Sequence, residues 1–209
     1  MITVEGIEGV GKSTNSEFIR TVLQDMDVPV RVTREPGGTA LGEDIRHLLL
    51  GHRHDGMADE TELLLMFAAR SEHLARVIRP ALASGTWIVC DRFTDATYAY
   101  QGGGRGIDSS RIEILENWVQ GALRPDLTLL LDVPVAVGLA RAGGRRQKAD
   151  RFEMQEQDFF EKIRACYLRR AESSPQRFRV IDTTMPIEQV QTRLRNVLMA
   201  YVKEVRAAE

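Results

Sequence analysis

The stretch Gly6–Thr14, GIEGVGKST, constrains the fold of this chain most, because it matches the phosphate-loop pattern G-x-x-x-x-G-K-[ST] at every fixed position. A short β-prone run, Ile2–Glu5, precedes it, and apolar residues recur at helical spacing after it, from Asn15 to Asp27. A loop between a strand and a helix is the context in which this pattern binds phosphate. A glycine-rich turn without a ligand is the alternative, and the flanking elements disfavour it.

The residues of this phosphate loop suit a nucleotide phosphate. Its glycines let successive backbone N–H groups turn toward an anion, and the start of the helix adds a partial positive charge. Lys12 is expected to reach the outer phosphates, and the Ser13 hydroxyl to ligate magnesium. The predicted nucleotide-binding residues are Gly6, Ile7, Glu8, Gly9, Val10, Gly11, Lys12, Ser13 and Thr14.

Four further short apolar runs predict strands, and helical patterns fill the gaps between them. The five expected strands are Ile2–Glu5, Val30–Arg34, Trp87–Asp91, Leu127–Asp132 and Phe178–Asp182. The expected helices lie near residues 15–27, 42–50, 60–84, 94–100, 109–122, 135–142, 155–172 and 187–205. This alternation predicts an α/β fold, a five-stranded parallel sheet with helices on both faces and ligands at the carboxyl ends of the strands.

The composition fits one domain over residues 1–209. Apolar residues make up 43% of the chain, enough for a single buried core. A formal net charge of −2 gives no overall attraction to nucleic acid or to an anionic membrane, so neither is an expected partner. Two cysteines are too few for a disulfide framework, and no signal-like or membrane-spanning run is visible, so we expect a cytoplasmic location.

Polar residues follow the second and third predicted strands, at the edge of the sheet where ligands bind. The turn after the second strand carries Arg34, Glu35 and Pro36 before two glycines. It is either a substrate-facing turn or an ordinary charged loop. Asp91 ends the third strand, where a phosphate-loop protein needs a carboxylate directed at magnesium.

The helix after the third strand carries polar residues on one face. Thr97, Tyr100 and Gln101 are spaced i, i+3, i+4, so they can line a pocket together. The Gln101 amide offers a donor and an acceptor, which suits the polar edge of a base. The glycine-rich run Gly102–Gly106 is predicted to be a loop that shapes the pocket.

Together these motifs resemble those of the bacterial thymidylate kinase family, which are nucleoside monophosphate kinases. Besides the phosphate loop, the resemblance rests on Arg34–Gly38 (REPGG), Asp91–Phe93 (DRF), Ala99–Gly106 (AYQGGGRG), Arg124–Leu129 (RPDLTL) and Asp150–Glu153 (DRFE). It covers nearly the whole chain. It implies the P-loop nucleoside monophosphate kinase fold with a short lid at about residues 142–152, and transfer of the γ-phosphoryl group of ATP to thymidylate (dTMP) with Mg²⁺.

The resemblance also implies roles for residues around the acceptor. Arg92 and Arg46 would hold the acceptor phosphate, Arg34 and Pro36 would line the substrate site, and Glu8 would meet the 3′-hydroxyl region of the sugar. The residues that would contact the thymine edge are Arg70, Thr97 and Gln101.

Two aromatic residues complete the acceptor site that the resemblance implies. Tyr100 would pack where a ribose 2′-hydroxyl projects, which favours deoxyribose. The aromatic slot of the family holds Met66 here, so Phe67, one residue later, would stack on thymine or else lie in the core.

Positive charge is densest in residues 141–151, between two predicted helices. The resemblance places a closing lid here, whereas the residues alone also fit a disordered charged loop. Arg145, Arg146 and Arg151 are the candidates for the cation that joins Lys12 and Arg92 in catalysis, and Arg141 would pack against adenine.

Two other functions remain as alternatives. A kinase for another nucleoside monophosphate would share the phosphate loop. A GTP-dependent switch would need a D-x-x-G element, which the chain lacks, and Gln147–Asp150 is a poor match to a guanine-reading motif. The resemblance further implies a homodimer, with the helix over residues 60–84 as a candidate interface.

Overall fold

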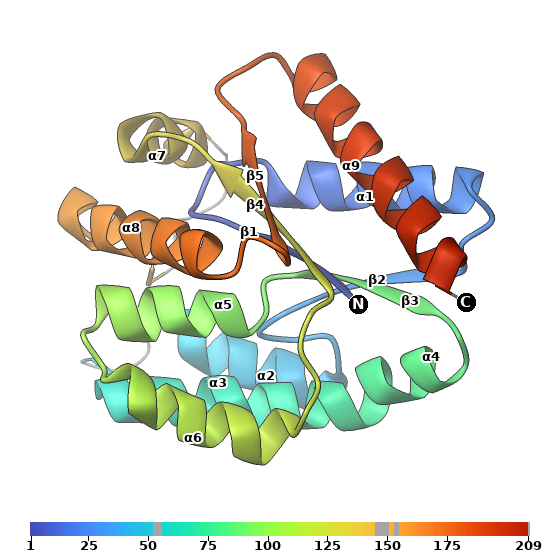
Figure 1. The fold of residues 1–209 in the computed structure, drawn as a ribbon. Helices are drawn as coiled ribbons and strands as arrows, with labels where there is room; N and C mark the ends of the chain where they lie inside the picture. The colour runs from blue at the N-terminus through green and yellow to red at the C-terminus, as the bar shows by residue number, and fades with distance from the viewer. Residues whose placement is uncertain (52–55, 145–150, 153–154, 209) are drawn as a thin grey trace.

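The computed structural model describes residues 1–51, 56–144, 151–152 and 155–208. Within them, five parallel strands form one sheet in the order β2-β3-β1-β4-β5 (Figure 1). The strands are β1 (Ile2–Glu5), β2 (Val30–Arg34), β3 (Trp87–Asp91), β4 (Leu127–Asp132) and β5 (Phe178–Asp182). The predicted α/β fold, a parallel sheet with these strands, is therefore confirmed.

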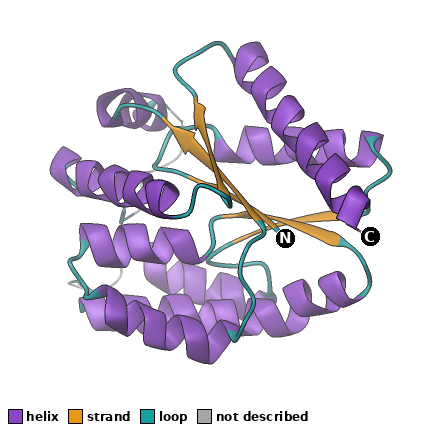
Figure 2. Ribbon diagram, in the orientation of Figure 1, coloured by secondary structure: helices purple, strands orange, loops and turns teal. Residues whose placement is uncertain are grey.

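Helices cover both faces of the sheet. They are α1 (Lys12–Asp25), α2 (Ala40–Leu50), α3 (Asp59–His73), α4 (Arg79–Ala83), α5 (Thr94–Thr97), α6 (Ser109–Gln120), α7 (Val135–Gly143), α8 (Gln157–Ser173) and α9 (Ile187–Ala208). Helices α1 and α9 pack together on one side, and the elements from α3 to α6 lie with α8 on the other (Figures 1 and 2). None of the described helices combines the length and apolar character needed to cross a bilayer.

The long helix predicted near residues 60–84 is present, with one change of winding. Between α3 and α4 the chain forms a π-helical segment, η1 (Leu74–Ile78). Pro80 follows in the first turn of α4 and has no N–H to donate. A π turn directly before it changes the hydrogen-bond register, so the helix continues through the proline.

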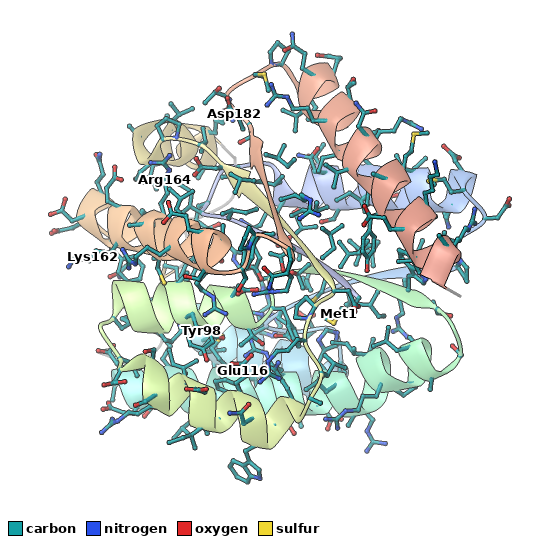
Figure 3. The ribbon with its side chains drawn as sticks, viewed as in Figure 1. Met1, Tyr98, Glu116, Lys162, Arg164 and Asp182 are labelled. Carbon is teal, nitrogen blue, oxygen red and sulfur yellow. The ribbon has the colours of Figure 1, made fainter. Side chains whose placement is uncertain are left out.

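The loop predicted for Gly102–Gly106 is wrong for its first three glycines, which are helical, and only Arg105 and Gly106 leave the helix. Residues Tyr98–Gly104 form a second π-helical segment, η2. Its glycines let α8 approach closely, because a Cβ at Gly104 would lie 2.5 Å from the Phe159 ring. Tight packing against α8 thus outweighs the low helix propensity of glycine. On its other side, the Tyr98 hydroxyl donates to Glu116 of α6 at 2.7 Å (Figure 3).

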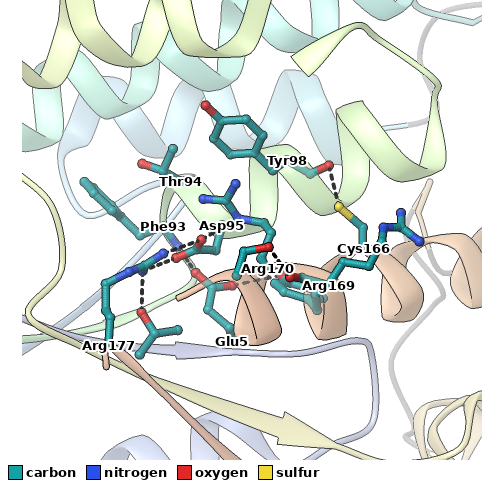
Figure 4. Close-up of polar contacts among 12 residues, drawn as sticks. Glu5, Phe93, Thr94, Asp95, Tyr98, Cys166, Arg169, Arg170 and Arg177 are labelled. Carbon is teal, nitrogen blue, oxygen red and sulfur yellow. Dashed lines mark hydrogen bonds and ion pairs between the residues drawn. The ribbon is translucent and has the colours of Figure 1, made fainter. Parts of the chain in front are cut away.

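A buried polar network ties the sheet to α5 and α8 (Figure 4). Glu5, at the end of β1, accepts from the Phe93 backbone N–H at 2.8 Å and from the Tyr167 hydroxyl at 2.8 Å. Asp95 of α5 accepts from Arg170 and Arg177. Burial, and after it the charge of Asp95, raises the pKa of Glu5 to about 8. The network fixes the strand that leads into the phosphate loop.

Candidate active site

The phosphate loop runs from the end of β1 into α1, as predicted from its sequence. Gly11 has left-handed backbone, with φ of 89°, and α1 begins at Lys12. The Lys12 Nζ donates to the carbonyl oxygens of Gly6 at 3.0 Å and Ile7 at 2.7 Å. Burial, with the nearby Arg92 charge, lowers the pKa of Lys12 to about 8. A bound phosphate offers this ammonium a better partner than two carbonyl oxygens.

The loop packs directly on α7. A Cβ at Gly9 would lie 1.9 Å from the Gly138 carbonyl oxygen, and a Cβ at Gly138 would lie 2.7 Å from the carbonyl oxygen of Glu8. No side chain fits at either position, so two glycines from distant parts of the sequence set the height of the loop above the sheet.

A cavity of about 650 Å³ begins at the phosphate loop and continues past the ends of β2 and β3. The predicted site residues that line it are Glu8, Gly9, Gly11, Lys12, Ser13, Thr14, Arg34, Pro36, Arg46, Arg70, Asp91, Arg92, Thr97, Tyr100, Gln101 and Arg141. The fold thus brings predicted site residues from seven separate segments of the chain to one cavity.

Several predicted residues do not line the cavity. Gly6, Ile7 and Val10 support the phosphate loop, the last two as part of the core. Phe67 is 2% exposed and packs with Leu63 and Ile112 in a cluster between α3 and α6. Met66 is the residue of this pair that lines the cavity. Stacking of Phe67 on a base is therefore wrong for this arrangement, because the helix turns its ring toward α6.

Glu8, Arg92 and Tyr100 meet on one side of the cavity. Glu8 Oε1 accepts from Arg92 at 2.6 Å and from the Tyr100 hydroxyl at 3.0 Å. Burial alone would raise the pKa of Glu8, but the charges of Arg92 and Lys12 outweigh it and lower that pKa to about 2. Because of this lowered pKa, Glu8 is an ionised acceptor at neutral pH. Arg92 has φ of 64°, a left-handed backbone that costs a non-glycine residue about 1–2 kcal/mol.

Arg70 is held by residues that sequence reasoning did not assign. Its Nε donates to Glu35 at 2.7 Å and one terminal nitrogen donates to Thr97 at 3.0 Å. His73 contacts the other Glu35 oxygen at 2.9 Å and the Thr33 hydroxyl at 2.7 Å. The second terminal nitrogen of Arg70, NH1, is buried without a hydrogen-bond partner among the described residues. Arg70 therefore keeps one nitrogen, with two N–H groups, that no described residue pairs.

The end of β3 fits a magnesium site. Asp91 lines the cavity with Ser13, and its Oδ1 is buried with no hydrogen-bond partner in the described structure. A buried carboxylate oxygen without a donor is the ligand that a hard divalent cation prefers. The residues present therefore fit the metal that the family resemblance implies.

The turn after β2 is folded onto α2. The Glu35–Pro36 peptide bond is cis. Arg46 donates to the Pro36 carbonyl oxygen at 3.0 Å, and Arg34 donates to Glu43 at 2.9 Å. Arg34 and Arg46 line the cavity near the end of β2. Arg141 lines it near the end of β5 and donates to the Thr183 carbonyl oxygen at 2.9 Å.

Arg151 occupies a different place from the one predicted. It donates to the carbonyl oxygen of Leu49 at 2.9 Å and to Glu62, and it does not line the cavity. The reason is electrostatic, because a carboxylate buried in α3 attracts the guanidinium. The other two lid candidates, Arg145 and Arg146, lie outside the described residues.

Comparison with known proteins assigns the family. A family model described as thymidylate kinase matches residues 4–194. The chain belongs to the thymidylate kinase family. The thymidylate kinases of Pseudomonas entomophila and Alkalilimnicola ehrlichii are each 57% identical to it, over 98% and 96% of this chain and 97% and 93% of theirs. The crystal structure of thymidylate kinase from Ehrlichia chaffeensis matches with a TM-score of 0.77 at 33% identity, covering 94% of this chain and 97% of that one.

One face of α3 carries most of the residues that sequence reasoning missed. Glu62, Met66, Arg70 and His73 recur at intervals of four, four and three. Met66 and Arg70 line the cavity, whereas Glu62 and His73 bind Gln101 and Glu35, which line it. Polar residues that recur at helical spacing around Arg70 are the signal that would have found Glu62 and His73.

Proposed function

We propose that the cavity is where this thymidylate kinase carries the γ-phosphoryl group of ATP to dTMP, producing ADP and dTDP. One observation supports the proposal above the rest. A single cavity runs from Lys12 to Arg70 and Gln101, so donor and acceptor can lie in one enclosed space. The bond from the γ-phosphorus to its bridging oxygen breaks, and an oxygen of the dTMP phosphate forms the new bond.

The phosphate loop, Gly6–Thr14, holds the donor phosphates in this proposal. Lys12 exchanges its two carbonyl partners for phosphate oxygens. Arg141 packs against adenine, since its guanidinium is held at the rim of the cavity by the Thr183 carbonyl. Ser13 and Asp91 would hold Mg²⁺, which would neutralise phosphate charge there.

The acceptor base is read by Arg70, Thr97 and Gln101. The unpaired NH1 of Arg70 donates to a keto oxygen of thymine. Thr97 accepts from Arg70 and so fixes the plane of that guanidinium. Met66 supplies the apolar contact to the base, because it lines the cavity one turn before Arg70.

The sugar and phosphate of dTMP lie between the base readers and the phosphate loop. Glu8 is ionised, so it accepts from the 3′-hydroxyl, and the Tyr100 ring occupies the space that a 2′-hydroxyl needs. The residues that hold the acceptor phosphate are Arg34, Arg46 and Arg92, with Pro36 beside them.

No side chain has to deprotonate the nucleophile. A phosphomonoester has a second pKa near 6 and is mostly dianionic at pH 7, so the problem is to bring two anions together. Lys12 and Arg92 supply positive charge for this within the described residues, and catalysis is positioning with charge neutralisation. That Arg145 or Arg146 adds a further cation stays a prediction.

We also propose a homodimer formed through α3 and α6. On α6, Ile114 and Trp118 are 67% and 81% exposed, and on α3 Leu64 is 56% exposed. An ion pair of 3.3 Å between Glu60 and Arg111 places the exposed faces of the two helices next to each other. A patch of this kind marks an interface in soluble proteins. Light scattering on Trp118→Glu, with loss of the dimer expected, tests this.

Turnover with dTMP and with uridine, cytidine, adenosine and guanosine monophosphates tests the function. We expect the highest kcat/KM with dTMP. A higher value for any ribonucleotide would favour the alternative of a kinase for another nucleoside monophosphate. Thermal stabilisation by GTP but not by thymidine nucleotides would favour the GTP-dependent switch. A cytoplasmic location, and the absence of nucleic-acid partners, stay predictions from sequence.

A further inference from the structure

Glu62 is a buried carboxylate next to the acceptor site that none of the roles above explains. It lies in the first turn of α3 and is 0% exposed. The Gln101 amide nitrogen donates to its Oε1 at 2.8 Å. Gln101 comes from η2 and lines the cavity, so Glu62 stands directly behind a residue that touches the acceptor base in the proposed function.

The contact decides which way the Gln101 amide points. An ionised carboxylate has acceptors only, so it takes the NH₂ end of the amide and rejects the carbonyl end. The carbonyl oxygen of Gln101 is then the group that this residue presents to a ligand. Without Glu62, the amide is free to turn by 180° and to present a donor instead.

Two arginines stabilise the charge on Glu62. Arg105, which follows η2, places NH2 3.3 Å from Oε2 and Nε 3.4 Å from Oε1, and Arg151 donates to Oε2. Guanidinium groups stay protonated at all pH values that a protein meets. Asp59, on the same helix, lies 3.7 Å from Arg105 and shares that cation. This is the setting a buried carboxylate needs in order to remain an acceptor.

Arg70, the other residue proposed to read the base, is also held by a buried carboxylate. Glu35 takes Nε of Arg70, so the unpaired NH1 of Arg70 is a donor. A donor from Arg70 and an acceptor from Gln101 match a keto oxygen beside a ring N–H, as in thymine and uracil. Cytosine presents an amino group beside a ring acceptor, so both contacts would be reversed.

We propose that Glu62 is a positioning residue that makes the site select a keto pyrimidine over an amino pyrimidine, and that Arg151 serves it as a counter-ion and not as a ligand of the phosphates. The proposal rests on the proposed function, because it needs Gln101 against the base. It adds a residue that touches neither substrate yet controls which base is accepted.

Replacing Glu62 with Gln tests this, since a glutamine of the same shape accepts or donates. The measurement is kcat/KM with dTMP and with dCMP, together with KM for ATP. We expect the ratio of the two kcat/KM values to fall by about tenfold or more, mainly through KM for dTMP, with KM for ATP changed less than about twofold. Glu116→Gln is the matched control, because Glu116 is also buried and bound by an arginine and a hydroxyl, but outside the cavity.

Each outcome separates the inference from the function. A wild-type enzyme that does not prefer dTMP to dCMP would contradict the proposed function itself. Wild-type preference that survives in Glu62→Gln would overturn the role of Glu62. An equal rise in KM for dTMP and ATP would show general loosening, which also overturns it.

Arg151→Met is the second variant, in case Glu62→Gln does not fold. If Arg151 is a counter-ion of Glu62, Arg151→Met should lower the ratio of kcat/KM for dTMP to kcat/KM for dCMP by several-fold. It should leave kcat at saturating dTMP within about threefold of wild type. A cation at the transferring phosphoryl would instead lower kcat by about 10²–10⁵. A fall of that size, with the base preference unchanged, would refute the assignment of Arg151.

Discussion

Replacing Asp95 with Asn is expected to lower the free energy of unfolding by about 3 kcal/mol. Asp95 is 1% exposed and sits between two arginines (Figure 4). Its Oδ1 accepts from Arg170 at 2.6 Å, and its Oδ2 accepts from Arg177 at 2.6 Å. Asparagine keeps the shape of the side chain but leaves both guanidinium groups without their counter-charge.

The expected loss of unfolding free energy depends on how deeply Asp95 and its two arginine partners are buried. Removing one partner of a buried ion pair costs about 3–5 kcal/mol, because the remaining charge is left uncompensated. The Arg170 and Arg177 side chains are 26% and 18% exposed, so water compensates in part. The charge of Asp95 is the second cause, behind burial, that raises the pKa of Glu5. Its loss in Asp95→Asn therefore also removes a repulsion between the two carboxylates. Both corrections place the cost at the lower end of the range.

Urea unfolding at pH 7, followed by circular dichroism and extrapolated linearly, measures the cost. Asp132→Asn is the matched control, since Asp132 accepts from Nε and NH2 of Arg164 at 2.7 and 2.8 Å. These two side chains are 19% and 30% exposed, so we expect a loss of only about 0–1 kcal/mol there. Equal losses in the two variants, or a loss below about 1 kcal/mol for Asp95→Asn, would refute the reasoning.

Three further predictions concern Glu5 of the buried polar network, Asp91 of the candidate metal site, and Gly138 beside the phosphate loop. Burial raises the pKa of Glu5 to about 8, so its contribution to stability is complete below about pH 4.5 and is lost as the pH rises through 8. The unfolding free energy of wild type minus that of Glu5→Gln should therefore fall between these pH values, by at most about 1.4 kcal/mol per pH unit. A difference that does not change with pH contradicts this prediction. Asp91→Asn should raise the Mg²⁺ concentration for half-maximal rate by about tenfold or more without lowering Tm; an unchanged Mg²⁺ titration removes Asp91 from the metal site. Gly138→Ala puts a Cβ 2.7 Å from the Glu8 carbonyl oxygen, so kcat/KM for ATP should fall by about 10²-fold. Gly143→Ala should match wild type, because no atom of the described residues lies within 4 Å of the added Cβ.

The elements that sequence reasoning located well are those with a local cause. The interior strand β4 is a mostly apolar run, buried except at its last residue, Asp132, as expected of a strand inside a parallel sheet. The phosphate loop likewise needs glycines and Lys12 at fixed spacing, so its place between β1 and α1 follows from the short stretch Gly6–Thr14 and its two flanking patterns.

The features that it missed depend on contacts between distant segments. The glycines of η2 are helical because α8 lies against them, and nothing within Gly102–Gly106 announces Phe159 more than fifty residues later. Phe67 and Met66 are adjacent in α3, so a rotation of one residue along the helix decides which enters the cavity. Propensity and spacing do not determine that rotation, whereas packing against Ile112 of α6 does.

The arginines show most clearly why composition cannot assign function here. The family resemblance gives both Arg70 and Arg151 a role at the site, and the sequence alone does not rank one above the other. Their hydrogen bonds separate them. Arg70 donates from Nε to Glu35 and from NH2 to Thr97, and its NH1 is buried without a hydrogen-bond partner among the described residues, which leaves it available to the ligand that we propose. Arg151 donates to Glu62 and to a backbone carbonyl away from the cavity, so its contacts already satisfy a protein carboxylate. Both side chains carry the same charge, so the hydrogen-bond partners of each guanidinium, and not its charge, are the reason we propose a substrate contact for Arg70 and a counter-ion role for Arg151.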